Sequence, residues 1–545
     1  MKKYILFITV LIASCASKEE ADMLIIGAKI YTCDSSFAET EAIAIKDGKI
    51  IATGSTEELK GDYSTKETID AKGAYIYPGF IDAHCHFSGY ALSSYRADLI
   101  GTKSFEEVLD KLVEYEQTND LRWIYGRGWD QNDWEIKQFP DKTALDSLYP
   151  SKPVILKRVD GHAVLCNQKA LDMAGISEST VIAGGIVEKK NGKLTGILID
   201  NATEAVEKLI LTPTGPSAER LLKAAEQECY SLGLTTVVDC GVTADVIDQL
   251  VAIYNDGKLS IGNSLLLSQD SATLEKYAPK GLYKKGQLQI NGIKLYADGA
   301  LGSRGACLLE EYADMPGHVG MLLSDISKMR EIAALAKAHQ FQLCTHAIGD
   351  SANRSILRLY SEFLPENNDL RWRIEHAQVV DNQDYIWFSK YKIIPSVQPT
   401  HAISDMPWAG ARLGEERLPT AYAYKKLLEQ NGWLPLGTDF PVEEINPLGT
   451  FYTAVARKDK NGKPEKGFMT ENALSRKDAL LGMTAWAAKS VFREKEKGSI
   501  EEGKDADIII LDKDIMIVPE NEILKTKVIY TIVKGKIEYN KKGAE

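Results

Sequence analysis

The run PGFIDAHCHF, residues 78–87, places two histidines two residues apart at the end of an apolar segment. In a β-strand, residues i and i+2 point to the same side, so His84 and His86 present both imidazoles on one face while Cys85 points away. Two nitrogens on one rigid strand supply half of a tetrahedral metal site. This pattern restricts the fold to one that can bring the remaining ligands to the same strand end.

Four further residues of ligand type each end a separate apolar run. They are Lys294 in INGIKLYADG, His346 in FQLCTHAIG, His376 in LRWRIEHAQ and Asp439 in WLPLGTDF. Taken singly, each has an ordinary explanation as a core or cap residue. Taken together, all five runs consist of apolar residues, a polar ligand type and then a turn. That form is typical of the C-terminal ends of barrel strands that carry catalytic groups.

Several longer motifs add to this pattern. They are GRGWDQNDW at 126–134, DGHAVLCN at 160–167, KLYADGALGSRGA at 294–306, RIEHAQ at 373–378, SVQPTH at 396–401 and GSIEEGKDADIIILD at 498–512. With these motifs the chain resembles the amidohydrolase superfamily, and within it the amidohydrolase-3 group of YtcJ-like proteins, which includes N-substituted formamide deformylases. No ligand position departs from the family pattern. The resemblance implies a metal-dependent hydrolase of non-peptide C–N bonds, and it leaves the substrate open.

Residues 76–490 alternate between apolar runs and helical segments, which predicts an α/β fold with a (β/α)8 TIM-like barrel. The candidate strands are YIYPGFID, KPVILKRVD, LTTVVDC, NSLLLSQ, INGIKLYADG, FQLCTHAIG, LRWRIEHAQ, YKIIPSVQPT and WLPLGTDF. Nine candidates compete for eight places. We assign KPVILKRVD to an insertion after barrel strand 1, about residues 87–215, because the ligands then fall on strands four, five, six and eight, as in the superfamily. Long insertions at a barrel rim are usually functional.

The two ends of the chain predict a separate small domain. Short strands separated by turns occupy residues 23–75, and runs of the same kind return within 491–545, in ADIIILD, VIYTIVKG and KIEYN. Two distant β segments that flank a long central region favour one β-sandwich domain built from both termini. The family resemblance implies the same arrangement.

The residue types fit a site for two divalent metal ions, zinc or alternatively manganese or iron. Neutral imidazoles bind Zn²⁺ well, and carboxylates suit harder ions. A lysine ammonium cannot ligate a cation, but a carboxylated Lys294 gains two oxygens that bridge two metals. The first ion would then be held by His84, His86 and Asp439, and the second by His346 and His376. Bound metal lowers the pKa of water to about 7. Asp439 is the expected catalytic base, and it later protonates the leaving nitrogen.

Other polar and aromatic residues are expected around the substrate. The inserted segment supplies Trp129, Trp134 and His162, and the barrel rim supplies Arg304, Gln398, His401 and Trp408. His162 is either a substrate contact or a structural hydrogen-bonding residue, and the tryptophans either recognise the substrate or pack. Cys344 is expected to fill the core. The expected substrate is a neutral N-substituted amide with a small acyl group at the metals and an apolar or aromatic group beneath the insertion.

Composition narrows the partners. The chain has 65 basic and 77 acidic residues and a net charge of −12, which argues against nucleic acid as a partner because nucleic acid needs clustered basic groups. A small-molecule amide remains the expected partner, and a homodimer remains open. Eight cysteines without a Cys-x-x-Cys pair do not indicate a disulfide framework.

The N-terminus carries the pattern of a bacterial lipoprotein signal. Lys2 and Lys3 precede the apolar run YILFITVLIAS, and residues 12–15 resemble a lipobox that ends at Cys15. We expect residues 1–14 to be a signal peptide, Cys15 to be lipidated and residues 15–22 to be a polar tether. The mature protein would then be lipid-anchored in the bacterial cell envelope, on the periplasmic or surface face of the outer membrane. A plain cleaved signal peptide is the alternative.

Two other functions remain open at this point. The same scaffold supports a deaminase or a cyclic-amide hydrolase, because hydroxide attack at an unsaturated carbon bonded to nitrogen is common to all three reactions. A non-catalytic surface binding lipoprotein is the other alternative. A binding protein has no need of Asp439 and Lys294 together with four histidines, so the ligand set favours an enzyme.

Overall fold

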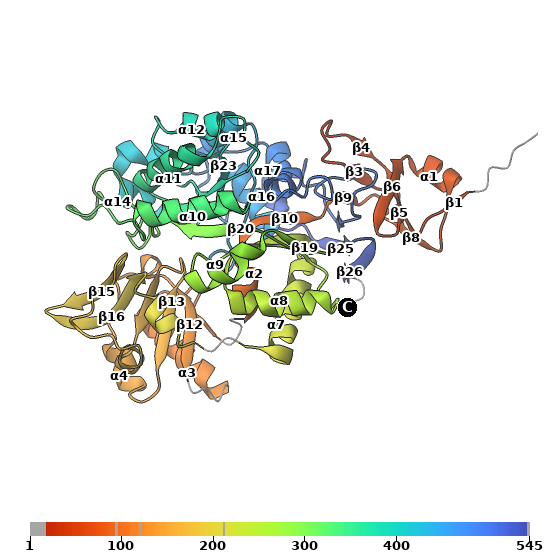
Figure 1. The fold of residues 1–545 in the computed structure, drawn as a ribbon. Coiled ribbons are helices and arrows are strands. Elements are labelled where there is room, and N and C mark those ends of the chain that lie inside the picture. The colour runs from red at the N-terminus through yellow and green to blue at the C-terminus, as the bar shows by residue number, and fades with distance from the viewer. Residues whose placement is uncertain (1–17, 93–95, 119–122, 211–212, 542–545) are drawn as a thin grey trace, which may run out of the picture.

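The computed structural model describes residues 18–92, 96–118, 123–210 and 213–541. A parallel sheet curves into a barrel at the centre of the molecule (Figure 1). Its strands follow one another in chain order: β10 (Phe80–Cys85), β17 (Leu234–Val242), β18 (Gly262–Leu267), β20 (Leu288–Tyr296), β21 (Gln342–Ala347), β22 (Arg373–His376) and β23 (Ile394–Ser396). A short strand, β19 (Tyr283–Lys285), pairs antiparallel with β20.

Residues 434–439 close the barrel between β23 and β10. The N–H of Ala83 donates to the carbonyl of Leu436 at 3.1 Å, and the N–H of Asp439 donates to the carbonyl of His84 at 2.8 Å. Leu436 also forms a parallel bridge with Val397. Regular pairing ends at Asp439, whose φ of 64° is left-handed. The (β/α)8 TIM-like barrel predicted from the sequence is therefore confirmed.

Helices between the strands cover the outside of the barrel. They include α7 (Gly215–Ser231), α8 (Ala244–Asn255), α10 (Ile326–Ala338), α11 (Asp350–Phe363), α12 (Tyr385–Tyr391) and α15 (Tyr424–Asn431). In α11 the buried side chains Ile356, Leu357 and Tyr360 recur at helical spacing and face the barrel strands. The helix therefore anchors the turn that follows His346.

A separate mixed sheet lies between α2 (Phe87–Leu92) and α7, and Figure 1 shows it in orange and yellow beside the barrel. Its strand order is β11 (Ala97–Asp98), β12 (Ile124–Trp129), β13 (Val154–Arg158), β14 (Ala163–Cys166), β16 (Lys193–Asp200) and β15 (Gly185–Lys190). The run KPVILKRVD forms β13, so it belongs to the insertion as predicted. The sheet has an apolar cluster on each face and needs no barrel residue to complete its core.

The two ends of the chain form a β-sandwich, as predicted. One sheet has the order β6 (Lys49–Gly54), β5 (Ala42–Lys46), β2 (Met23–Ile26) and β8 (Glu67–Asp70). The other joins the C-terminal strands β24 (Ile508–Leu511), β25 (Val528–Val533) and β26 (Lys536–Asn540) to β9 (Tyr75–Pro78). The run YIYPGFID divides into β9 in the sandwich and β10 in the barrel. The division falls at Gly79, where a Cβ would lie 2.3 Å from the hydroxyl oxygen of Thr235. A side chain at Gly79 would therefore clash with β17 at the point where the chain passes from the sandwich into the barrel.

Within the described residues, no helix is both long enough and apolar enough to cross a bilayer. The expected signal peptide and Cys15 lie outside the described residues. The end of the expected tether is described, and Glu19–Glu20 (β1) pairs with Tyr63–Ser64 (β7). The seven described cysteines are free thiols.

Candidate metal centre

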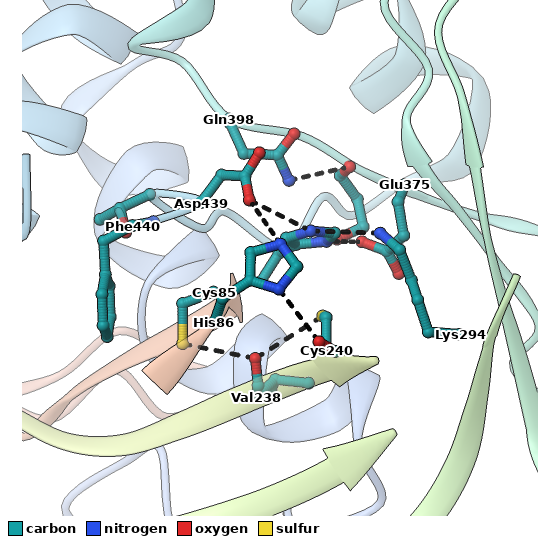
Figure 2. Close-up of polar contacts among 12 residues, drawn as sticks. Cys85, His86, Val238, Cys240, Lys294, Glu375, Gln398, Asp439 and Phe440 are labelled. Carbon is teal, nitrogen blue, oxygen red and sulfur yellow. Dashed lines mark hydrogen bonds and ion pairs between the residues drawn. The ribbon is translucent and has the colours of Figure 1, made fainter. Parts of the chain in front are cut away.

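The two histidines at the end of β10 are oriented by hydrogen bonds on their far sides. Nδ1 of His84 lies 2.5 Å from Oε2 of Glu375, and Nδ1 of His86 lies 3.0 Å from the carbonyl oxygen of Cys240 (Figure 2). Because each Nδ1 donates to an oxygen, each Nε2 keeps its lone pair. Partners of this kind fix the tautomer and the ring orientation of metal-binding histidines.

Asp439 faces these two nitrogens. Its Oδ1 lies 3.2 Å from Nε2 of His86 and 3.5 Å from Nε2 of His84. Two ligands bound to one tetrahedral zinc ion lie about 3.3 Å apart, because each bond is about 2.0–2.1 Å long. Oδ1 is buried and makes no hydrogen bond within the described residues. The spacing and the unsatisfied oxygen together fit an ion held by these three side chains.

The other predicted ligands come from adjacent strands. Register pairs place Lys294 beside Cys344, two residues before His346, and Ala347 beside His376. The three ligands therefore lie within a few residues of one another near the C-terminal ends of β20, β21 and β22. Nζ of Lys294 lies 3.3 Å from Nε2 of His84. The ring centroids of His346 and His376 are 4.6 Å apart.

These two histidines keep a nitrogen free for a metal. Nδ1 of His376 is buried without a hydrogen bond among the described residues. Nε2 of His346 lies 3.4 Å from the carbonyl of Gly299, which leaves its Nδ1 as the available ligand atom. The structure therefore gathers all six predicted ligands at the barrel mouth.

Burial determines the charge of these groups. Burial, with the charge of Lys294 adding to it, lowers the pKa of His84 to about 4. Burial also holds the pKa values of His346 and His376 well below their usual range. Burial alone would raise the pKa of Asp439, but the neighbouring histidines outweigh it and hold this pKa well below its usual range. Neutral imidazoles beside an ionised carboxylate are the protonation states that bind a divalent ion.

The site opens into a cavity of about 1030 Å³ between the barrel mouth and the insertion. The metal-ligand residues that line it are His86, Lys294, His346, His376 and Asp439. His401, the first residue of α13 (His401–Ser404), also lines the cavity, and its Nε2 lies 3.4 Å from Oδ2 of Asp439. Its ligand atom lies within 4.8 Å of those of His376 and Asp439, so His401 can bind either substrate or metal.

His162 reaches the cavity from the insertion. Its ring centroid lies 5.0 Å from that of His346, and its Nδ1 lies 2.8 Å from Oδ1 of Asp200. The Asp200 carboxylate rests against two glycines of the loop after β20. A Cβ would lie 2.5 Å from this carboxylate at Gly299 and 2.6 Å at Gly305. Asp200 therefore orients His162 and packs the insertion against the barrel loop that follows β20.

Two expectations for the tryptophans of the insertion are wrong. Trp129 and Trp134 do not line the cavity but pack in the core of the insertion, where their indole nitrogens donate to the carbonyls of Leu156 and Thr102. The physical reason is a bulge between Arg127 and Trp129, where Gly128 has a φ of 113°. A bulge breaks the alternation of faces along a strand. Trp408, in contrast, lines the cavity as expected.

Two expectations for the barrel rim are also corrected. Arg304 does not line the cavity, because its guanidinium is held by Asp314, with a shortest contact of 2.9 Å. Gln398 is buried behind the site, where its amide donates to the carbonyl of Ser396 at 3.4 Å (Figure 2). Cys344 is fully buried in an apolar cluster, as expected.

Two functional residues were missed from the sequence, Asp200 and Glu375. Glu375 accepts a hydrogen bond from Nε of Arg373 at 2.6 Å as well as contacting His84. Burial alone would raise the pKa of Glu375, but Arg373 and His84 hold it well below its usual range. The signal was present, since Arg373 and Glu375 are opposite charges at i and i+2 in an apolar strand and so face the same side.

The chain is similar to known proteins along most of its length. The Amidohydro_3 model of the amidohydrolase family matches residues 67–539. The chain is 33% identical over 94% of its length to a Bacillus subtilis protein named amidohydrolase YtcJ, of which it covers 99%. It is 26% identical over 96% of its length to N-substituted formamide deformylase of Arthrobacter pascens, of which it also covers 99%. An uncharacterised metal-dependent hydrolase of Pyrococcus horikoshii has a TM-score of 0.75 and 30% identity, over 91% of this chain and 99% of that chain.

Proposed function

The chain belongs to the amidohydrolase family, and on that premise we propose that it hydrolyses the C–N bond of an N-substituted amide and releases an amine. The observation that carries the proposal is the spacing of Oδ1 of Asp439 from the two β10 histidines, 3.2 and 3.5 Å, which fits a shared divalent ion. Similarity along almost the whole length of N-substituted formamide deformylase supports an N-acyl or N-formyl amide.

The side chains have separate tasks in this reaction. A divalent ion, when bound, makes hydroxide available near neutral pH and polarises the amide carbonyl. Asp439 accepts a proton from the attacking water and delivers it to the leaving nitrogen, which is a poor leaving group without that proton. Glu375 keeps His84 in the ligand tautomer, and Asp200 keeps Nε2 of His162 directed away from Asp200 for contact with the substrate.

Lys294 is proposed to be carboxylated. In that reaction its neutral amine adds to CO₂, forms an N–C bond and loses one proton, which gives a carbamate with two ligand oxygens. Lys294 is 1% exposed, and its Nζ lies 3.3 Å from Nε2 of His84, beside the first ligand group. A carbamate there would allow the site to hold a second ion, for which His346 and His376 would be the ligands.

Metal analysis and amine release test the function together. Protein produced with zinc or manganese should contain close to two divalent ions per chain and should release amine from an N-formyl and N-acyl amine library. His84→Ala and His376→Ala should lose both metal and activity, whereas the matched variant His339→Ala, half-buried at the C-terminal end of α10 and outside the cavity, should keep both. Metal-free wild-type protein, or metal-loaded protein that releases ammonia from aminopurines but no amine from any amide, would refute amide hydrolysis.

We also propose lipid anchoring through Cys15. The motivation is the lipobox in the sequence, since Cys15 lies outside the described residues. Wild-type protein expressed in a Gram-negative host should partition with membranes, because several acyl chains anchor a protein stably where a single chain does not. Cys15→Ser should not incorporate labelled fatty acid. A fully soluble wild-type protein after fractionation would contradict the anchor.

A further inference from the structure

The inserted sheet presents a row of charged side chains to the cavity. Asp98, Arg127 and Lys157 are register partners on β11, β12 and β13, so they lie side by side on one face of the sheet. Arg127 and Lys157 both line the cavity. Arg127 and Gly128 of β12 line the cavity, and the bulge between Arg127 and Trp129 turns Trp129 into the core of the insertion.

Arg127 differs from its neighbours because its charge is not matched. Nζ of Lys157 lies 2.7 Å from Oε1 of Glu207, and Arg158 is held between Asp130 and Asp160. Among the described residues, Arg127 forms no ion pair. Within the part of the chain that the structure describes, its Nη2 donates to the carbonyl of Val159 at 3.1 Å, and its Nε is buried without a hydrogen bond.

Asp98 does not neutralise Arg127 even though the two residues are register partners. Oδ1 of Asp98 instead accepts the backbone N–H of Ile100 at 3.1 Å. Arg96 adds a second positive charge to this wall, since it lines the cavity and its pKa is lowered by burial and then by the charge of Arg127. Positive charges on one cavity wall attract an anionic ligand.

The position of Arg127 connects it to the reacting centre. Gly161 has a φ of 78°, and a Cβ on it would lie 3.7 Å from Nη1 of Arg127. The next residue is His162, whose ring is 5.0 Å from that of His346. The guanidinium of Arg127 therefore lies beside the turn that carries His162, on the insertion side of the cavity.

We propose that Arg127 binds a carboxylate carried by the substrate at the end far from the scissile amide, an inference that rests on the proposed amide hydrolysis. A guanidinium fork matches a carboxylate through two parallel hydrogen bonds. The terminal nitrogens of Arg127 then gain hydrogen-bond partners beyond the carbonyl of Val159. The substrate class is an N-acyl or N-formyl amine whose amine part ends in a carboxylate.

The test compares matched amides on matched variants of the metal-loaded, full-length protein. The substrates are N-formyl and N-acetyl derivatives of ω-amino carboxylic acids of two to six carbons, the corresponding ω-amino carboxamides and the corresponding phosphonates. The variants are Arg127→Gln, Arg127→Lys and Lys157→Gln. Lys157→Gln is the matched control, because Lys157 lies beside Arg127 on the next strand but is already paired with Glu207.

We expect wild-type protein to prefer the carboxylate over the carboxamide at one chain length. Arg127→Gln should lower kcat/KM for that carboxylate by about ten- to a hundredfold, mainly through KM, because a charged hydrogen-bonded contact is lost. The carboxamide should change less than about threefold. Arg127→Lys should fall between the two, since a lysine keeps the charge without the fork. Lys157→Gln should keep the preference.

Other outcomes separate this inference from the proposed function. Equal losses on carboxylates and carboxamides in Arg127→Gln would show a structural role and overturn the inference while amide hydrolysis stands. A stronger phosphonate preference would overturn the assignment of a carboxylate. If wild-type protein hydrolyses no amide, the proposed function fails. Calorimetric titration with N-acetylglycine then still tests whether Arg127 binds a carboxylate. Binding that is lost in Arg127→Gln but kept in Lys157→Gln supports it, and equal binding by all three proteins refutes it.

Discussion

The barrel mouth and the inserted sheet face the same cavity, but they differ in how strictly the strand pattern determines where each side chain points. Along a barrel strand the side chains alternate between the closed interior and the covering helices. A polar ligand on the interior side of a strand end therefore points into the barrel mouth. The six predicted ligands come together there. The inserted sheet has an apolar cluster on each face, so a tryptophan next to a glycine can enter either side. Sequence patterns are therefore more informative in the barrel than in the insertion.

Asp439→Asn should have the largest effect on the barrel side of this comparison. The amide keeps the shape but removes the charge and the proton acceptor, so kcat should fall by about a hundred- to ten-thousandfold. Asp405→Asn is the control, because Asp405 lines the same cavity but is satisfied by Gln378 and Tyr422. Steady-state amine release would measure both. Equal losses in the two variants would mean that Asp439 is not special among the cavity carboxylates.

Trp129→Ala should have its main effect on stability rather than on recognition. The Trp129 side chain is 1% exposed and packs in the core of the insertion, so its loss should cost about 3–5 kcal/mol in the free energy of unfolding. Chemical denaturation would measure this loss. Any folded fraction should keep its ratio of kcat/KM between large and small substrates. Trp408→Ala, at a residue that lines the cavity, should change that ratio with a smaller loss of stability. A changed ratio of kcat/KM in Trp129→Ala, with little loss of stability, would show that Trp129 contacts the substrate.

Glu375→Gln should weaken metal binding without touching a ligand. The variant removes the charge that holds Nδ1 of His84 at 2.5 Å, and losing such a partner costs about ten- to a hundredfold in metal affinity. Competition with a chelator, read by metal analysis, would measure the change. Glu226→Gln is the control, because Glu226 is also buried but accepts the backbone N–H groups of Ser260 and Ile261 far from the ligands. An unchanged metal affinity in Glu375→Gln would remove its assigned role.

Much of the fold, and the gathering of the six candidate ligands at the barrel mouth, was predictable because both follow from periodicity. Apolar runs that end in a ligand and a turn identify parallel strands without knowledge of their neighbours, and His84 with His86 share a face by alternation alone. The errors lie where alternation fails. The bulge at Gly128 reverses the face of Trp129, and Gln398 lies beyond the end of β23, where no strand geometry directs its side chain. Asp200 was not predicted because its role depends on a contact with a loop distant in the sequence.

Arg304→Gln should have the smallest effect of these substitutions, and it tests whether the Arg304 guanidinium faces the cavity. Its Nη2 lies 2.9 Å from Oδ2 of Asp314, both side chains are about a quarter exposed, and Asp314 keeps a second partner in Arg412. A partly exposed ion pair of this kind contributes about 0–1 kcal/mol, so Arg304→Gln should shift the free energy of unfolding by no more than that. Because Arg304 does not line the cavity, kcat/KM should change by less than about twofold. Arg412→Gln should cost more, since Arg412 is buried and joins Asn132 of the insertion to the carbonyl of Gly302 in the barrel loop. A tenfold loss of activity in Arg304→Gln at unchanged stability would show that this guanidinium contacts the substrate in the cavity.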